Sequence, residues 1–518
     1  MNLGRYVSRS AKFYPEQNAM IFEGRQITYR ELDRRTNCLA QGFYAQGLKK
    51  GDRVAIQSWN RHEIAEMEVA CYKAGMVRIP INARLSTTEV IDILNNAEVR
   101  AFLGDKSHLE PIMDHRPSLD TVRTFIHLDG PHAGAEAYET LLAENRDTAP
   151  DVEVEPDDLA VLTYSSGTTG KLKGIMQSYG NRLAMIRKAL MFPEIRIKPG
   201  DKLVHVGPIT HVSGMLLMPF FFTGGCNVIL NRFDLDMLLD IVQREQINFT
   251  MVVPTMINVI VSHPKAREYR FDSLKGIFYG AAPISPTRVQ QAIDLFGPIL
   301  IQGYGMSETT SFVTVLTATD HTEALQHNPA RLSSCGRPVF DTEVRVVNEE
   351  GRDVAPGEIG EITARGADIM KGYYRDEELT GKTIVDGWIH SGDMARVDDE
   401  GYLYIVDRKT DMIITGGFNV YPSEIEKILY RHPAVMEACA IGVPDDKWGE
   451  AIKAVVVLKK GHAATEEEIM GHCRESLSAY KKPQSVDFVT ELPKNPNGKI
   501  ARRSVRERFW AGKERRVN

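Results

Sequence analysis

The chain has 518 residues, of which 43% are hydrophobic and 25% are charged, as is typical of folded globular proteins. Its formal net charge of −6 argues against a nucleic-acid-binding protein, which normally carries a basic excess. A chain of this length exceeds one ordinary hydrophobic core, so we expect two or more domains.

Cysteine spacing and hydropathy indicate the cellular compartment of the protein. The six cysteines lie far apart and form no CxxC or metal-binding pattern, which favours free thiols in a reducing compartment. The N-terminal segment lacks the apolar core of a signal peptide. The longest apolar run, residues 215–222, falls far short of the ~18 residues that span a bilayer and predicts a buried strand or helix. We therefore expect a cytoplasmic protein.

Strand-like runs alternate with helical patterns over the first 330 residues. Thr28 and Glu31 have capping-box spacing, which predicts a helix after the hairpin-like IFEGRQITY. The strand candidates are residues 53–59, 100–105, 159–166, 202–208, 226–230, 249–254 and 275–282. The helix candidates are residues 89–97, 235–245 and 286–296. This alternation predicts an α/β protein with doubly wound layers.

The pattern changes twice in the remainder of the chain. Residues 343–366 contain short strands, Gly-Asp turns and alternating polarity, as in a small β-barrel or meander. A second change comes near residue 408. The segment that follows has helix candidates at 423–432 and 466–480 and strand candidates at 435–443 and 452–460, enough for a small α+β domain.

The stretch LTYSSGTTGKLKG, residues 162–174, has the composition of a phosphate-binding loop. A glycine- and hydroxyl-rich turn after a strand can direct several N–H and O–H groups at one anion, and Lys173 can neutralise its charge. The Walker A pattern is excluded, because only two residues separate Gly167 from Gly170 and Leu172 follows Lys171. An ordinary flexible turn is the alternative for this stretch by itself.

The stretch QGYGMSETT, residues 302–310, combines an aromatic ring, a carboxylate and hydroxyl groups. A carboxylate beside a polyphosphate is repelled unless a divalent cation bridges the two, so Glu308 implies Mg²⁺. Alone, the stretch also fits a glycine turn before a helix, with Ser307 as the cap.

Two further segments carry charged groups at turns. Asp393 and Arg408 lie fifteen residues apart, where an Asp can accept from both hydroxyls of a ribose and an Arg can bond the sugar or a phosphate. Lys499 follows an Asn-Pro-Asn-Gly turn in LPKNPNGKIARR, residues 492–503. Taken separately, the turn Ser391-Gly392-Asp393 is of a kind that is usually structural, and a Lys placed like Lys499 is usually a solvated surface charge.

Together, in order and spacing over essentially the whole chain, these four segments resemble the adenylate-forming (AMP-binding) enzyme superfamily, and specifically its acyl-CoA synthetase (fatty-acid or aryl-acid CoA ligase) branch. The resemblance implies an N-terminal ATP- and acyl-binding domain at 1–407, built of two α/β layered subdomains plus a small β-barrel. It implies a hinge at 408–411 and a small, mobile α+β C-terminal lid domain at 412–518. It also implies ATP and Mg²⁺ as cofactors and coenzyme A as co-substrate.

The resemblance assigns roles to individual residues. Lys499, His211 and Glu308 match catalytic positions, and Thr168 and Glu308 would lie near Mg²⁺. Tyr304 would stack on the adenine, Asp393 would hold the ribose with help from Arg408, and residues 416–426 would line the pantetheine tunnel. The expected cofactor-binding residues are Thr163, Ser165, Ser166, Gly167, Thr168, Thr169, Gly170, Lys173, Gly280, Ala281, Ala282, Pro283, Gln302, Gly303, Tyr304, Gly305, Met306, Ser307, Thr309, Asp393, Ile405, Arg408, Lys409, Gly416 and Gly417.

The reaction implied is a two-step ligation. The carboxylate of an acid would attack the α-phosphorus of ATP to give an acyl-AMP and pyrophosphate, and the thiol of CoA would then displace AMP. In such enzymes the C-terminal domain rotates about the hinge between the steps, so that Lys499 serves the first step and GGFNVYP the second. Three positions depart from the family: Leu172 replaces a usual Pro, Thr410 a usual Lys or Asp, and Thr210 a usual apolar or aromatic residue.

The acid itself is only partly indicated. The segments expected to line the acyl pocket contribute Met215, Leu216, Met256, Tyr279 and Phe312, with no evident Arg or Lys for a second carboxylate. A fatty or aromatic monocarboxylic acid fits, and a dicarboxylic acid is disfavoured. Adaptable methionine walls leave the chain length open, and plain core packing is the alternative for each of these residues.

Other activities on the same scaffold stay open. The chain can be an adenylating enzyme that loads an acyl group onto a carrier protein, and a luciferase-like oxygenase is a more remote alternative. From another class, a non-catalytic nucleotide-binding protein would keep the loops and lose Lys499, which is present here. The expected partners are the acid, ATP and CoA, with no nucleic acid and no transmembrane segment; a homodimer is left open.

Overall fold

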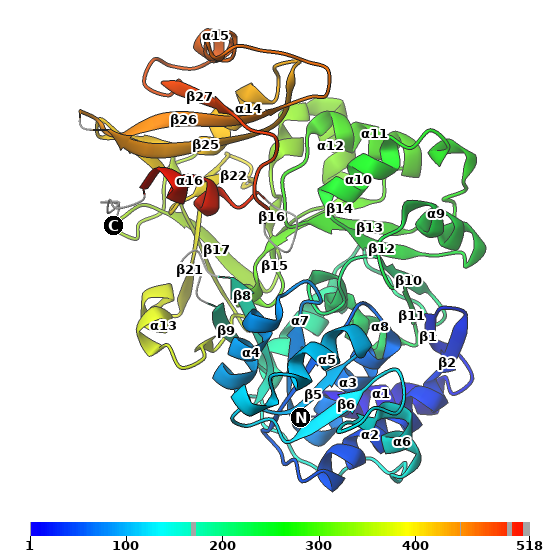
Figure 1. Ribbon diagram of the computed structural model, residues 1–518. Helices are drawn as coiled ribbons and strands as arrows, with labels where there is room; N and C mark the ends of the chain where they lie inside the picture. Colours follow the sequence, from blue (N-terminus) through cyan, green and yellow to red (C-terminus); the bar gives the residue numbers. More distant parts are fainter. Residues whose placement is uncertain (1, 167–171, 446, 495–499, 511–518) are drawn as a thin grey trace. The chain divides into compact units, whose positions relative to one another are not determined.

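The computed structural model describes residues 2–166, 172–445, 447–494 and 500–510 (Figure 1). The chain forms two compact units, which we call unit 1, Met1–Val344 with Ala364–Ile389, and unit 2, Arg345–Thr363 with His390–Asn518. All six cysteines are buried and unpaired, as their spacing predicted. None of the helices in the described part of the chain combines the length and apolarity needed to cross a bilayer.

The first layered part of unit 1 contains an eight-stranded sheet of order β19-β9-β8-β4-β3-β5-β6-β7. Its inner strands are parallel, whereas β8 and β9 pair as an antiparallel hairpin. The strands are β3 (Arg53–Gln57), β4 (Val77–Ile81), β5 (Val99–Gly104), β6 (Thr124–His127), β7 (Glu136–Ala137), β8 (Leu159–Ser166), β9 (Leu172–Ser178) and β19 (Gly372–Tyr373).

Helices cover this sheet with two separate apolar clusters. One cluster joins helices α1, α2, α3 and α7 to the sheet, and the other joins α4 and α5 to it. Every residue of α3 is buried, which explains its lack of a polar face. The helices are α1 (Leu3–Phe13), α2 (Tyr29–Ala45), α3 (His62–Ala74), α4 (Thr87–Asn96), α5 (Lys106–Met113), α6 (Tyr138–Ala143) and α7 (Tyr179–Met191).

The second layered part of unit 1 is a nine-stranded sheet of order β16-β15-β14-β13-β12-β10-β11-β1-β2, whose central strands are parallel. Its strands are β1 (Asn18–Phe22), β2 (Arg25–Thr28), β10 (Lys202–His205), β11 (Cys226–Ile229), β12 (Phe249–Val252), β13 (Gly276–Gly280), β14 (Leu300–Gly305), β15 (Phe312–Leu316) and β16 (Arg337–Pro338).

Helices α9 to α12 pack beside β12, β13 and β14 through one apolar cluster (Figure 1). The helices around this sheet are α8 (Leu217–Thr223), α9 (Leu235–Arg244), α10 (Pro254–Val261), α11 (Pro286–Phe296) and α12 (Ala318–His327). The apolar run at 215–222 proves to be the end of a 3₁₀ turn followed by the buried helix α8. Parallel strands alternating with helices thus confirm the predicted α/β class.

Local signals set the start of helix α2. Strands β1 and β2 form the predicted hairpin, and Thr28 caps α2 by accepting from the Glu31 backbone N–H at 3.2 Å. The Glu31 carboxylate bonds Arg25 at 3.1 Å, so the cap has one side-chain contact to the helix where the sequence pattern predicted a reciprocal pair.

Apart from β19, the strands after residue 340 form two five-stranded sheets. The first has the order β17-β18-β21-β20 with β22 on β21, in the region for which the sequence predicted a small barrel or meander. The second has the order β24-β23-β26-β25 with β27 on β26. Helices α14 and α15 cover one face of the second sheet and α16 joins the apolar cluster on β25 and β26.

The bounds of these elements complete the fold. The strands are β17 (Thr342–Val347), β18 (Ile359–Gly366), β20 (Ile384–Val385), β21 (Trp388–Val397), β22 (Leu403–Arg408), β23 (Ile413–Thr415), β24 (Phe418–Val420), β25 (Val435–Asp445), β26 (Gly449–Leu458) and β27 (Ser485–Phe488). The helices are α13 (Glu377–Thr383), α14 (Pro422–Leu429), α15 (Glu466–Ser476) and α16 (Arg502–Trp510).

Candidate active site

The hairpin of β8 and β9 carries the glycine-rich stretch at its tip. Ser165 lies opposite Lys173 and Thr163 lies opposite Ile175 in the antiparallel register. Opposed residues share one face of a hairpin, so Thr163, Ser165 and Lys173 lie together. The other face packs Tyr164 against the first sheet's core. Hydroxyl groups and one ammonium group therefore share a single face, as an anion-binding hairpin requires.

Lys173 and Glu308 meet around a tyrosine that the sequence analysis did not identify. The Lys173 ammonium lies 5.4 Å from the centre of the Tyr373 ring, and the Tyr373 hydroxyl donates to Glu308 Oε1 at 3.0 Å. Burial, with the charge of Glu308, raises the pKa of Tyr373, so this hydroxyl keeps its proton and remains a donor. The structure thus brings the predicted phosphate hairpin and the predicted metal carboxylate together.

Backbone crowding shapes the predicted cofactor-binding segments 280–283 and 302–305. A Cβ on Gly280 would lie 2.2 Å from the Gly303 carbonyl oxygen, and one on Gly305 would lie 2.1 Å from the Ser311 carbonyl oxygen. Ala281 and Thr310 adopt positive φ angles of 65° and 57°. Such non-glycine conformations cost roughly 1–3 kcal/mol each and gather at functional sites. Both strained residues lie within or beside a predicted binding segment.

A short polar chain supports Gln302 from behind. Tyr279 is 2% exposed, and its hydroxyl lies 2.7 Å from His321 Nε2 and 3.1 Å from Gln302 Oε1. His321 Nδ1 lies 2.6 Å from the Thr317 carbonyl oxygen, so Nδ1 carries the ring proton, and His321 Nε2 and Gln302 Oε1 share the single proton of the tyrosine hydroxyl. Burial lowers the pKa of His321 to about 4. The hydroxyl of Tyr279, a residue predicted to line the acyl pocket, is thus engaged by His321 and Gln302.

The buried His321 makes stability depend on pH in a defined direction. Its pKa is about 4 in the folded chain against 6.5 ordinarily, so the unfolded chain takes up a proton first as the pH falls. We expect the free energy of unfolding to drop by about 3 kcal/mol through this group between pH 6.5 and 4. His321→Gln should remove the uptake of one proton on unfolding, and with it the corresponding pH dependence of the free energy of unfolding in this range. An unchanged slope, or the same loss in the exposed His327→Gln control, would contradict this.

The remaining predicted residues of unit 1 are less closely gathered. His211 is exposed and precedes the 3₁₀ turn Val212–Leu216. Thr309 is buried and its Oγ1 accepts from the Met306 N–H at 3.0 Å, which closes the turn around Ser307. The five predicted acyl-pocket residues fall in three apolar clusters, with Met215 in one, Met256 and Tyr279 in the second, and Leu216 and Phe312 in the third.

Asp393 and Arg408 of unit 2 lie opposite each other in the antiparallel pair of β21 and β22. Arg408 Nε lies 3.3 Å from Asp393 Oδ1, and Asp393 is 7% exposed whereas the Arg408 side chain is 58% exposed. Lys409 bonds Glu361 at 3.1 Å, and Ile405 is 43% exposed. The two residues predicted to hold a ribose are therefore neighbours.

Gly416 and Gly417 form the turn of the β23–β24 hairpin, with φ angles of 57° and 82°. Two successive positive φ angles make a turn that glycine adopts at the lowest cost. A Cβ on Gly416 would also lie 2.7 Å from the Trp448 ring. Gly167, Thr168, Thr169, Gly170 and Lys499 lie outside the described residues, as does the side chain of Ser166.

Arg502 holds the predicted hinge segment within unit 2. It bonds both oxygens of Glu426 at 2.8 Å, Asp411 at 2.9 Å and Asp407 at 3.4 Å. Its side chain is 18% exposed and that of Asp407 is 5% exposed. The sequence showed this arginine only as one of two charges after Lys499. One guanidinium thus joins α16, α14 and both ends of 407–411.

Removing this guanidinium should destabilise unit 2. Arg502→Met leaves the Glu426 and Asp407 carboxylates without their counter-charge, whereas Asp411 keeps Arg506 at 4.0 Å. Breaking a buried pair on one side costs about 3–5 kcal/mol. We expect faster amide hydrogen exchange in α14 and α16. Arg503→Met is the matched control, because its ion pair with Glu507 is 40% and 57% exposed and contributes little. Equal effects of the two substitutions would refute the role of Arg502.

The donor set fits a magnesium–nucleotide complex. Within the described ranges no group of three or more His, Cys, Asp or Glu residues could hold a metal ion. Mg²⁺ on nucleotides needs no such cage, since it usually keeps waters and binds one or two carboxylates plus phosphate oxygens. Glu308 has one oxygen bonded by Tyr373, so a single oriented carboxylate is present beside the hairpin.

Doubly wound layers with a hydroxyl-rich hairpin close to an oriented carboxylate are typical of nucleotide-using enzymes. The AMP-binding enzyme family matches residues 7–374 and the AMP-binding enzyme C-terminal domain matches residues 424–499. The chain therefore belongs to the AMP-binding enzyme family, whose members form adenylates.

Similar proteins agree in length as well as in fold. A feruloyl-CoA synthase of Amycolatopsis sp is 37% identical, covering 98% of this chain and 99% of its own. A medium/long-chain-fatty-acid–CoA ligase of Mycobacterium tuberculosis is 33% identical, covering 99% and 91%. Among solved structures, the amide bond synthetase McbA from Marinactinospora thermotolerans is 26% identical with a TM-score of 0.87, covering 98% and 100%.

Proposed function

We propose that this chain is an ATP-dependent acid–thiol ligase that converts a fatty or aromatic monocarboxylic acid to its acyl-CoA through an acyl-AMP, releasing AMP and pyrophosphate. The observation that supports this most directly is that Lys173 and Glu308 both contact Tyr373, so the predicted phosphate-binding hairpin and the predicted metal-binding carboxylate are close enough to act together. The names of the full-length relatives point to the same chemistry.

The first step is limited by charge, because a carboxylate anion must approach a polyphosphate. Thr163, Ser165 and Lys173 would bind the phosphates, and Glu308 with Thr168 would hold Mg²⁺. The ion supplies charge neutralisation when bound. Lys499 would donate to the oxygens that gain charge at the α-phosphorus. Because the hairpin and Glu308 are fixed by neighbouring contacts, these groups need little rearrangement as the reaction proceeds.

The second step needs different helpers at the same acyl carbon. Asp393 and Arg408 would keep hold of the ribose, and His211 would lie beside the carboxylate and the entering thiol. Residues 416–426 would line the path of the pantetheine, and rotation about 407–411 would exchange them with Lys499. Arg502 contacts both ends of that segment, at Asp407 and Asp411, so the rotation would have to keep or break these two ion pairs.

The acceptor of the acyl group is the part of the proposal with competitors. A fatty acid–[acyl-carrier-protein] ligase of Streptomyces coeruleorubidus is 33% identical over 98% of this chain, and the amide bond synthetase shares the fold. All three acceptors use the same acyl-AMP. They differ in the second step, where a CoA thiol, a carrier thiol or an amine attacks.

The test separates the two steps. Purified protein with Mg²⁺, ATP and a panel of fatty, aromatic and dicarboxylic acids should release pyrophosphate with the monocarboxylic acids. Adding CoA should then yield AMP and an acyl-CoA detectable by mass. Failure to release pyrophosphate with any acid would refute acid activation. Transfer to a carrier protein or an amine in preference to CoA would refute the thiol-ligase assignment alone.

A further inference from the structure

Helix α7 (Tyr179–Met191) directly follows the phosphate hairpin, and side chains on one of its faces hydrogen-bond the distant segment 367–369. Asn181 and Lys188 are seven residues apart, two turns along the same side of the helix. Asn181 Nδ2 donates to the carbonyl oxygens of Ala367 at 2.9 Å and Ile369 at 2.8 Å. Lys188 Nζ donates to Asp368 Oδ2 at 2.6 Å. The segment 367–369 is therefore held from both ends of α7.

The same segment holds the loop that carries Glu308. The Met370 N–H donates to the Glu308 carbonyl oxygen at 2.8 Å, and Ser311 Oγ donates to Asp368 Oδ2 at 2.5 Å. Lys188 also donates to the Phe312 carbonyl oxygen at 3.0 Å. Glu308 is thus held by its own backbone carbonyl and by the residues that follow it. Lys188 contacts both Asp368 and Phe312 and so supports the second of these attachments.

Burial makes this network costly to disturb. The side chains of Lys188 and Asp368 are 5% and 1% exposed. Beside them Thr310 has a positive φ of 57°, and its Oγ1 is buried without a hydrogen-bond partner in the described part of the chain. A strained threonine with an unpaired hydroxyl persists only where its surroundings determine the backbone firmly. The buried Lys188–Asp368 pair is linked to it through the neighbouring Ser311, which donates to Asp368.

We propose that Lys188 is a positioning residue that acts through Asp368 and Ser311 to set the direction of the Glu308 carboxylate relative to the phosphate hairpin. This inference rests on the proposed function, since it takes Glu308 as the carboxylate that binds the magnesium–nucleotide complex. It links one helix to both halves of the site: α7 continues the hairpin in sequence and secures the Glu308 loop in space.

The test measures how much Mg²⁺ strengthens nucleotide binding. The paired variant Lys188→Met/Asp368→Leu removes both buried charges together, because a buried pair replaced by apolar groups is often neutral for folding. The second carboxylate near Lys188, that of Asp341 at 3.4 Å, is 28% exposed and stays in contact with water in this variant. Affinity for a non-hydrolysable ATP analogue is measured by calorimetry with and without Mg²⁺. We expect the Mg²⁺-dependent gain to fall by about 10-fold, as for lost partners of metal ligands, with the metal-free affinity unchanged.

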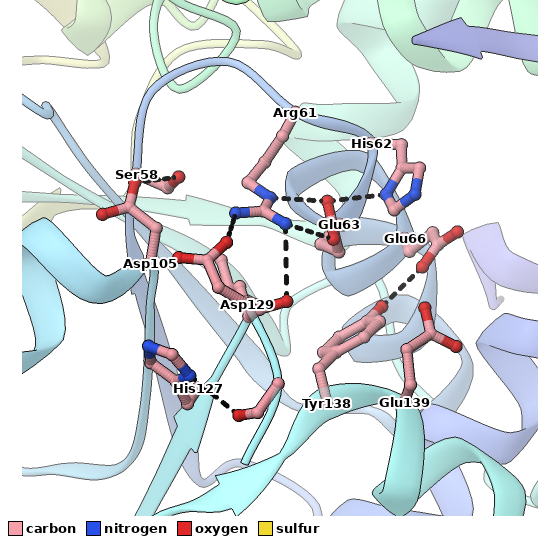
Figure 2. Close-up of polar contacts among 12 residues, drawn as sticks. Ser58, Arg61, His62, Glu63, Glu66, Asp105, His127, Asp129, Tyr138 and Glu139 are labelled. Atoms are coloured by element: carbon pink, nitrogen blue, oxygen red, sulfur yellow. Dashed lines mark hydrogen bonds and ion pairs between the residues drawn. The ribbon is translucent and has the colours of Figure 1, made fainter. Parts of the chain in front are cut away.

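A second ion network of unit 1 supplies the matched control. Arg61 bonds Glu63 through two nitrogens at 2.8 and 2.7 Å and Asp129 at 2.6 Å, and Glu63 also meets His62 (Figure 2). These side chains bond one another at the start of α3. Arg61→Met/Glu63→Leu therefore removes a comparable ion pair without touching the Glu308 loop, and should leave the Mg²⁺-dependent gain unchanged.

Each result decides the matter. A full Mg²⁺ gain in the Lys188 pair variant, or an equal loss in the Arg61 control, would overturn the proposal. If the pair variant fails to fold, Ser311→Ala removes only the hydroxyl bond to Asp368 and should reduce the Mg²⁺ gain about 3-fold, in the range of one ordinary hydrogen bond; no reduction overturns the proposal. Failure of the proposed function would appear separately, as wild-type protein that releases no pyrophosphate with any acid.

Discussion

Replacement of Lys499 by alanine is expected to slow acyl-AMP formation by roughly 10²–10³, the usual effect of losing one donor to a developing oxyanion. Thioester formation from supplied acyl-AMP should proceed at a rate close to that of the unsubstituted protein. The difference arises because the negative charge that Lys499 would neutralise develops at the α-phosphorus in the first step only. Pyrophosphate exchange measures the first step, and acyl-CoA formation from synthetic acyl-AMP measures the second.

Lys494 is the matched control for this experiment. It lies in the same segment as Lys499, and its ammonium pairs with Glu437 at 2.6 Å on the surface of unit 2. Lys494→Ala removes one positive charge from that segment and should alter neither half-reaction by more than about 2-fold, as expected for an exposed ion pair. Equal loss of both half-reactions in Lys499→Ala would contradict a role confined to adenylation.

Elements with local signals could be predicted from the sequence. The strand 159–166 and the helix 286–296 match β8 and α11 residue for residue. Helix α11 has Ser285 as its cap, Pro286 at its first position and Gly297 after its last, so both ends are written in adjacent residues. Each of the four motifs was likewise a short stretch that can be read directly from the sequence, and their order along the chain sufficed to identify the family.

Pairings between distant segments could not be predicted in the same way. Strand β9 was absent from the predicted strands, since what defines it is its antiparallel pairing with β8. Tyr373 and Glu308 are 65 residues apart, and Lys188 and Asp368 are 180 apart. A lone Lys within a helical pattern usually indicates a solvated face, so nothing local marked Lys188 as buried.

Backbone conformation was the other hidden element of the site. Gly280 and Gly305 leave room for backbone carbonyl oxygens that a Cβ would meet at 2.2 and 2.1 Å. Thr310 gives the opposite signal, because a β-branched residue disfavours the positive φ that it adopts. Such a conformation is set by the contacts of Ser311 and Asp368 around it, and these appear only once the chain is folded.

Glu308→Gln is expected to lower the rate of acyl-AMP formation by roughly 10²–10³ and to raise the Mg²⁺ concentration needed for half-maximal rate. Glutamine keeps the size of the side chain and an oxygen that can accept from Tyr373, so the loop should remain in place. What it loses is the negative charge that would hold the cation against the phosphates. Pyrophosphate exchange at varied Mg²⁺ gives both quantities.

Two companion variants separate charge from orientation in the Glu308 experiment. Tyr373→Phe keeps the carboxylate and removes its hydroxyl donor at 3.0 Å, so the rate should fall by about 10-fold, in line with one hydrogen bond to a charged group. The exposed Glu323→Gln on α12 removes a carboxylate elsewhere and should have no effect on the Mg²⁺ requirement. If Glu308→Gln leaves that requirement unchanged, Glu308 does not bind the metal, and the charge balance proposed for the adenylation step is wrong. If Tyr373→Phe is as slow as Glu308→Gln, the carboxylate acts only when the tyrosine orients it, and orientation contributes as much to the step as charge.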